Sequence, residues 1–171
     1  MDFLENSESD DILEFQEIID QHNYEDNLEE FEHFLYLIIS IFNNHHQDDI
    51  FIQKIFRFLK FYGDLIKQTY SNFEIFNIFR SNKKILLFLL ENSILIFDED
   101  IYQSIIQYNK TKKNNYCYFF YPEIKKNIGE EKAKYIEDQL ISDNPNIFDN
   151  FEYKRHEGQN DSYICSLIRQ D

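Results

Sequence analysis

Histidine is the residue type in this chain that first suggests a metal site or proton transfer, because imidazole binds zinc and titrates near neutral pH. The five histidines are His22, His33, His45, His46 and His156. No two of them are spaced four residues apart on one helix, and none belongs to a His-Glu-x-x-His arrangement. We therefore interpret them as exposed loop histidines and expect no metal site and no cofactor.

The cysteines offer a second possible chemistry. Cys165 and His156 can meet across a turn at Gly158, and a thiol is a nucleophile where its surroundings lower its pKa. Cys165 falls, however, where a helix would pack against its neighbours, so we interpret it as a small buried hydrophobic residue. With Cys117 as the only other cysteine, the chain has too few for a disulfide framework or a zinc site of cysteine pairs.

Acidic residues are the most abundant candidates for chemistry, since the chain has 32 of them. The runs Asp98-Glu99-Asp100 and Asp143-Asn144 lack the alternating oxygen ligands and central glycine of an EF-hand loop, and helix capping accounts for them. Two carboxylates can also catalyse glycoside hydrolysis, but nothing marks one pair above the others. We expect that the protein is not an enzyme. A small hydrolase that uses unmarked carboxylates remains the less favoured alternative.

Composition argues against several other functions. The three glycines are too few and too far apart to form a glycine-rich phosphate-binding loop. A net charge of −15 disfavours binding to nucleic-acid phosphates and to anionic membrane surfaces. The longest apolar run, Ile85–Leu90, is far shorter than the roughly 20 residues that span a bilayer. The acidic N-terminus, 1–11, lacks the features of a signal peptide. These observations predict an intracellular, cytoplasmic protein that binds neither nucleic acid nor membrane.

The first half of the chain reads as a succession of helices. Apolar residues at spacings of three and four predict a short helix ending near Gln21, a helix over about 26–43, and one from Asp48 or Asp49 to Ile66 that Gly63 can kink. Ser71 and Glu74 have the spacing of a capping box before a helix that ends near Phe79. The sequence thus predicts short helices joined by short loops.

The second half continues this pattern. Ser81 or Asn82 is expected to cap a buried helix through Leu90, and the acids at 98–100 begin another helix. We expect a loop over 109–115 and, at 116–121, an extended or short helical plug of aromatic residues in the core. The remaining predicted helices are 122–127, 130–141, 145–156 and one that carries Ile164, Leu167 and Ile168.

Together these elements predict an all-α fold: an array of short antiparallel helices, α-solenoid-like. The chain also has 18 Phe and 12 Tyr residues. Most must lie in the core, but an open helical array rich in aromatic residues also presents grooves suited to a peptide or a helix of a partner.

Three stretches carry a resemblance to a known family. Residues 148–171, with Glu157-Gly158-Gln159-Asn160-Asp161-Ser162-Tyr163-Ile164-Cys165, resemble the junction at which protist ankyrin-repeat proteins enter their first repeat. Residues 118–124 (Tyr-Phe-Phe-Tyr-Pro-Glu-Ile) and 84–91 (Lys-Ile-Leu-Leu-Phe-Leu-Leu-Glu) are similar to two upstream signatures. The polar composition of residues 1–9 predicts a flexible acidic N-terminus. The resemblance implies a helical leader domain (10–157) and the start of an incomplete ankyrin-like repeat (158–171), so that the all-α array ends in an incomplete ankyrin-type helix at the C-terminus.

The resemblance implies a non-enzymatic protein–protein interaction module, because ankyrin repeats are protein-binding scaffolds. About three repeats are needed for a stable stack, so the repeat surface itself is not expected here. Ile164, Leu167 and Ile168 would instead lie on an uncapped end, which makes them candidate residues for binding a protein partner of unknown identity. They can also pack on the 145–156 helix, or mediate self-association as a homo-oligomer, which is the alternative function.

Overall fold

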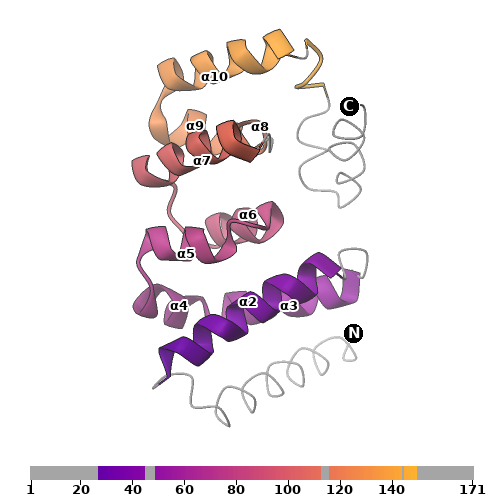
Figure 1. Ribbon diagram of the computed structural model, residues 1–171, viewed down its shortest axis with the longest axis vertical. Helices are drawn as coiled ribbons and strands as arrows, with labels where there is room; N and C mark the ends of the chain where they lie inside the picture. The colour runs from indigo at the N-terminus through magenta and orange to yellow at the C-terminus, as the bar shows by residue number, and fades with distance from the viewer. Residues whose placement is uncertain (1–26, 45–48, 113–115, 144, 150–171) are drawn as a thin grey trace, which may run out of the picture. The chain divides into compact units, whose positions relative to one another are not determined.

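The structure is a computed structural model that describes residues 27–44, 49–112, 116–143 and 145–149. Within these residues it contains nine helices and no strand, which confirms the all-α class (Figure 1). In chain order, the helices are α2 (Leu28–Asn44), α3 (Asp49–Phe61), α4 (Gly63–Thr69), α5 (Asn72–Phe79), α6 (Lys83–Glu91), α7 (Glu99–Lys112), α8 (Tyr116–Phe119), α9 (Tyr121–Ile128) and α10 (Glu130–Asp143). The chain divides into two compact units, unit 1 (Met1–Ile96) and unit 2 (Phe97–Asp171).

Unit 1 contains two helical hairpins that lie side by side. α2 packs against α3, α5 packs against α6, and the hairpins meet where α2 lies beside α5 and α3 beside α6. Aromatic rings fill these contacts. The Phe56 ring of α3 lies 5.6 Å from Phe42 of α2 and stacks on Phe88 of α6 at 4.4 Å. Each hairpin therefore buries its apolar stripes against the other.

The predicted helix over 26–43 is α2. The buried residues of this helix are Phe31, Leu35, Ile38, Ile39 and Phe42. Their spacings of three and four place them on one face, as the sequence pattern requires. The side chains opposite this stripe stay in solvent.

The predicted helix from Asp48 or Asp49 to Ile66 is divided in two at Tyr62. The backbone of Tyr62 has φ −90° and ψ 8°, so α3 ends before it and α4 begins at Gly63. Ile94 explains the glycine, because a Cβ atom at position 63 would lie 2.6 Å from Cδ1 of Ile94. The expected kink is therefore a break between two helices. At this break the backbone of Gly63 lies so close to Ile94 that a side chain at position 63 would not fit.

Hydrogen-bonded caps begin the second hairpin. Ser71 and Glu74 form the predicted capping box at α5. Of the two residues proposed to cap α6, Asn82 does so: its Oδ1 accepts from the backbone N–H of Ile85 at 3.0 Å. The Asn82 amide also donates to Oδ1 of Asn43 at 2.6 Å, which links the end of α2 to the start of α6.

Unit 2 is organised around α8 and its aromatic neighbours. The predicted aromatic plug at 116–121 is a short helix rather than an extended segment, and Tyr116–Phe119 are all buried. The expected loop over 109–115 was wrong for its first part, because α7 continues to Lys112. Asn109 accounts for part of the difference: its side chain accepts from the backbone N–H of Tyr116 at 3.1 Å, so it connects α7 to α8.

The hairpin of α9 and α10 completes the described part of unit 2. Gly129 joins the two helices with φ 110°, a conformation that glycine adopts without strain. The only alanine of the chain, Ala133, is fully buried with Ile136 and Leu140 on the inner face of α10. Its small side chain suits the close contact between α10 and α9.

The helix expected over 145–156 was wrong where it can be examined, because residues 145–149 form turns. The Asp149 N–H donates to the Asn146 carbonyl at 3.1 Å, as in a turn. The Phe148 ring packs 4.9 Å from Tyr121 and 5.8 Å from Tyr118. These aromatic contacts hold the segment without helical hydrogen bonds.

Candidate functional site

A candidate binding surface among the described residues lies where α2 and α5 meet in unit 1. The Tyr70 hydroxyl donates to the Leu28 carbonyl at 3.3 Å, and its ring stacks on Phe31 with the centroids 6.1 Å apart. At the other end, Asn43 accepts from Asn82. The start of α2 thus lies near the start of α5, and the end of α2 lies near the turn that follows α5. The two helices run in the same direction, with a seam between them.

Five residues along this seam interact electrostatically: Glu32, Tyr36, Tyr70, Glu74 and Arg80. We call them the α2–α5 seam. Glu32 and Tyr36 are four residues apart on α2, so the carboxylate and the hydroxyl lie on one side of the helix and interact. Tyr36 is 46% exposed, and Leu28, about two turns earlier on α2, is 53% exposed. The seam therefore presents aromatic and apolar groups to solvent beside carboxylates.

The tyrosines of the seam lie in a negative field. Burial, followed by the charges of Glu32 and Glu74, raises the pKa of Tyr70 to about 12. Burial and Glu32 also raise the pKa of Tyr36, while Arg80 lowers it. Both hydroxyls therefore remain neutral at physiological pH, so the charge of the seam comes from its carboxylates.

Glu74 is the carboxylate that the local structure fixes most firmly. Its Oε2 accepts from the Ser71 hydroxyl at 2.6 Å and from the Ser71 backbone N–H at 2.8 Å. The hydrogen bond from the Ser71 side chain, and then that from its backbone, lowers the pKa of Glu74. The capping box that begins α5 therefore also holds a negative charge at one end of the seam.

This arrangement is suited to binding a cation. A ring face attracts a cation, and carboxylates beside it add Coulomb attraction and hydrogen-bond acceptors. The described residues contain no group of three or more His, Cys, Asp or Glu side chains that could hold a metal ion. Among the sequence candidates that can be placed, His33 is exposed on α2 and Cys117 is buried.

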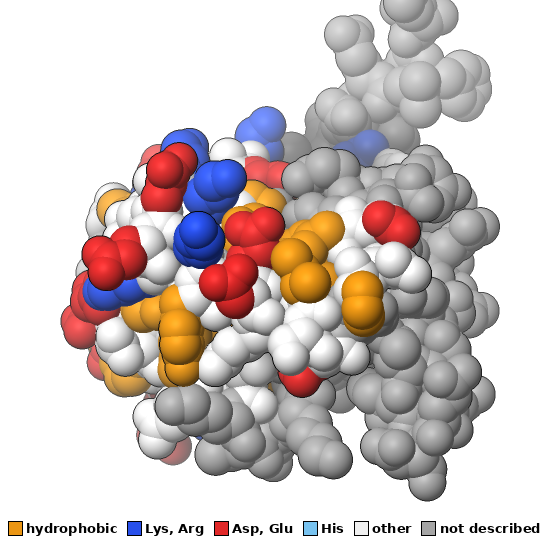
Figure 2. All heavy atoms as spheres, turned by 90° about the horizontal axis from the view of Figure 1, so that it is seen from above, with side chains coloured by type: hydrophobic (Ala, Val, Ile, Leu, Met, Phe, Trp, Pro, Cys, Tyr) orange, Lys and Arg blue, Asp and Glu red, His pale blue; other side chains and the backbone are white. Residues whose placement is uncertain are grey.

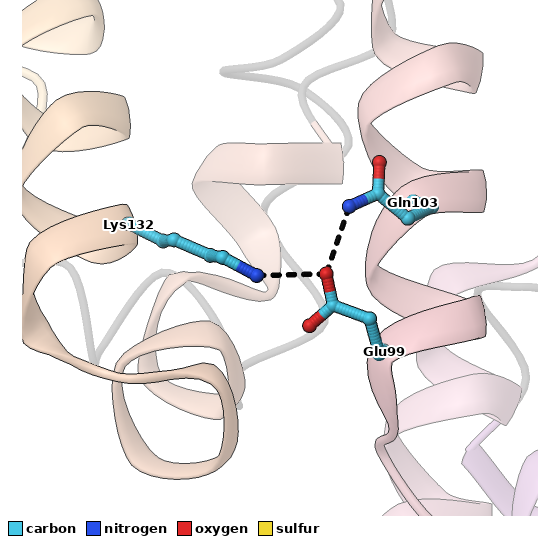
Figure 3. A network of polar contacts seen from close by, with 3 residues as sticks. All are labelled: Glu99, Gln103 and Lys132. Carbon is cyan, nitrogen blue, oxygen red and sulfur yellow. Dashed lines mark hydrogen bonds and ion pairs between the residues drawn. The ribbon is translucent and has the colours of Figure 1, made fainter.

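Unit 2 contains a second polar network, and in this one the cation is supplied by the chain (Figure 3). Oε1 of Glu99 on α7 accepts from Lys132 of α10 at 2.8 Å and from Gln103 at 2.8 Å. The Lys132 ammonium also lies 5.3 Å from the centre of the Tyr102 ring. The hydrogen bond from Lys132, and then that from Gln103, lowers the pKa of Glu99. This network connects α7 to α10.

The outer side of α10 is a weaker candidate. Tyr135 is 65% exposed and accepts from the Gln139 side chain at 2.8 Å. Figure 2 looks onto the side where α10 lies, and its hydrophobic side chains are interspersed with acidic, basic and uncharged ones. The visible face thus lacks the continuous apolar area that marks many binding sites.

The residues singled out by the sequence and those of the seam are different. Ile164, Leu167 and Ile168 lie outside the described residues, as do Cys165, His156, His22, His45 and His46. The seam was missed because its members come from two helices and the loop between α4 and α5. One signal was present: Glu29, Glu32 and Tyr36 follow at spacings of three and four on the polar side of α2.

Comparison with known proteins gives no family for the chain. None of the helices in the described residues is long and apolar enough to cross a membrane. No protein-family model matches the chain, and neither the curated proteins nor the solved structures show a significant similarity to it. The ankyrin leader resemblance therefore stays a prediction based on residues 84–91, 118–124 and 148–171.

Proposed function

We propose that this chain is a non-enzymatic protein–protein interaction module, built as an α-solenoid-like array of stacked helical hairpins. The observation that carries the proposal is the α2–α5 seam, in which a half-exposed tyrosine interacts with carboxylates and an exposed leucine lies about two turns away on the same helix. Tyrosine is enriched where proteins bind one another, because it combines a large apolar area with a polar group.

The arrangement of unit 1 supports this proposal. In an α-solenoid, equivalent helices of successive hairpins lie next to each other and form an extended surface. In unit 1, α2 lies beside α5 and α3 lies beside α6, which is the pattern expected of two such repeats. The ankyrin leader resemblance is consistent with this pattern, and the leader role is part of the proposal.

The proposal is tested by capture of partners from a cell extract, with quantification of each captured protein. We expect Tyr36→Ser to abolish specific capture. Leu37→Ser is the matched control, because Leu37 lies next in sequence, is 53% exposed and occupies another side of α2. It should keep full capture. Circular dichroism would confirm that both variants fold.

Two outcomes would overturn the proposal. One is that the wild-type chain captures nothing above background. The other is that Tyr36→Ser and Leu37→Ser capture the same proteins in the same amounts as the wild type, which would show that the seam takes no part in binding.

A further inference from the structure

Unit 2 shows how this chain pairs a lysine with a tyrosine and a glutamate. Glu99 and Tyr102 are three residues apart on α7, and Lys132 approaches from another helix. Its ammonium bonds the carboxylate at 2.8 Å and lies 5.3 Å from the centre of the ring. One cation thus satisfies the carboxylate and the ring face together.

Unit 1 contains a similar acceptor pair. Glu32 and Tyr36 are four residues apart on α2, so they lie on one side of the helix as Glu99 and Tyr102 do on α7. Among the described residues, no lysine or arginine forms an ion pair with Glu32. Tyr36 is 46% exposed, and its ring is accessible from solvent.

The charges around this pair favour a cation. Glu74 keeps its charge through the capping box, and Glu29 lies one turn before Glu32 on the same side of α2. Arg80 is the basic side chain whose field reaches Tyr36, and its Nη1 donates to Oδ1 of Asn77 at 3.3 Å. Three carboxylates against one guanidinium leave a local excess of negative charge, within a chain of net charge −15.

We infer that the α2–α5 seam binds a basic segment of a partner protein, with an arginine or lysine side chain placed over Tyr36 and paired with Glu32. The inference rests on the proposed function and names the chemistry of its partner. The exposed Leu28, about two turns before Tyr36 on α2, provides a contact for an apolar residue farther along the same segment. The net negative charge of the chain would speed the encounter.

The test uses the full chain and two synthetic peptides with blocked ends, each alternating leucine with a second residue. That residue is arginine in the first peptide and citrulline in the second, which has nearly the same shape but no charge. Titration calorimetry gives the two dissociation constants near physiological salt. We expect the arginine peptide to bind, and to bind at least about tenfold more tightly than the citrulline peptide.

Two isosteric variants separate the seam from the general field of the chain. Glu32→Gln should weaken binding of the arginine peptide by roughly threefold to tenfold, because it removes the paired carboxylate. Glu30→Gln removes the same charge from the same helix, but Glu30 lies on another side of α2. It should weaken binding by less than about twofold, which is the effect of a charge that acts only through screened solvent.

Three results would overturn the inference: no binding of the arginine peptide, equal binding of the citrulline peptide, or equal weakening by Glu32→Gln and Glu30→Gln. None of them affects the proposed function if Tyr36→Ser still loses captured partners while Leu37→Ser retains them. The partner would then be recognised by apolar or neutral polar contacts. If the capture experiment with Tyr36→Ser and Leu37→Ser also failed, the proposed function would be overturned together with the inference.

Discussion

Gly63 shows how a single residue determines the course of the chain in unit 1. It begins α4 directly after the break at Tyr62, and it faces the buried side chain of Ile94. The space left by the missing Cβ atom is filled by Ile94, whose Cδ1 and Cγ1 atoms would lie 2.6 and 2.7 Å from such an atom. The backbone of Gly63 does not have a positive φ, so its conformation does not require glycine. The close approach of Ile94 does.

Gly63→Ala should therefore lower the free energy of unfolding, by up to about 2 kcal/mol. Overpacking in a core typically costs about 1 to 3 kcal/mol, and the better helix propensity of alanine offsets roughly 1 kcal/mol of this. Urea denaturation would measure the change.

Ile94→Ala provides the second half of a double-mutant cycle, because it removes both contacting atoms. In that background Gly63→Ala should be close to neutral or stabilising. An equal loss of stability in both backgrounds would show that steric contact with Ile94 is not the reason for the glycine.

At the scale of elements, α7 and α10 are connected by a charge pair that titrates. The pKa of Glu99 is lowered and that of Lys132 is raised, in each case first through the hydrogen bond between them. The Glu99 contribution is present above its pKa in the unfolded chain and is lost as pH falls through its lowered folded pKa. The Lys132 contribution is complete below its unfolded pKa and disappears only at alkaline pH.

Lys132→Met should therefore lower stability at about pH 7, and the difference from the wild type should shrink as the pH falls toward about 3. Urea unfolding at a series of pH values would measure this difference. Lys134→Met is the control, since Lys134 is an exposed lysine of the same helix. If the two variants showed the same pH dependence, the ion pair with Glu99 would not be responsible.

At the scale of the whole molecule, charge is the dominant feature. A net charge of −15 on 171 residues repels itself in the folded state. Two ion pairs between described residues that oppose this repulsion, Lys67 with Asp64 and Lys132 with Glu99, are exposed. Exposed pairs of this kind contribute little to stability. Repulsion should therefore outweigh them.

Raising the salt concentration from about 10 mM to about 150 mM shortens the screening length from about 30 Å to about 8 Å. We expect the urea midpoint of each unfolding transition to rise over this range, because screening weakens the repulsion more than it weakens the exposed ion pairs. Sodium chloride is the suitable salt, and glucose at equal osmolality is the control. A midpoint that fell with added salt would contradict the expectation.

The sequence by itself determined the class of the fold and much of its detail. Helical periodicity located α2, and local side-chain chemistry identified the capping box at Ser71 and Glu74. These features depend on residues within one or two turns of each other, so a pattern of spacings is enough to reveal them. The same reasoning was wrong at 109–112 and 145–149, where contacts with α8 and with its neighbouring rings outweigh local preference.

Only the tertiary structure decided where the candidate site lies. Glu32 and Tyr36 are neighbours on one helix, but Tyr70 and Glu74 reach them from about 40 residues away because α2 and α5 pack side by side. No local pattern encodes that contact. It follows from the burial of two separate apolar stripes in one core, which brings their polar margins together and so creates the seam.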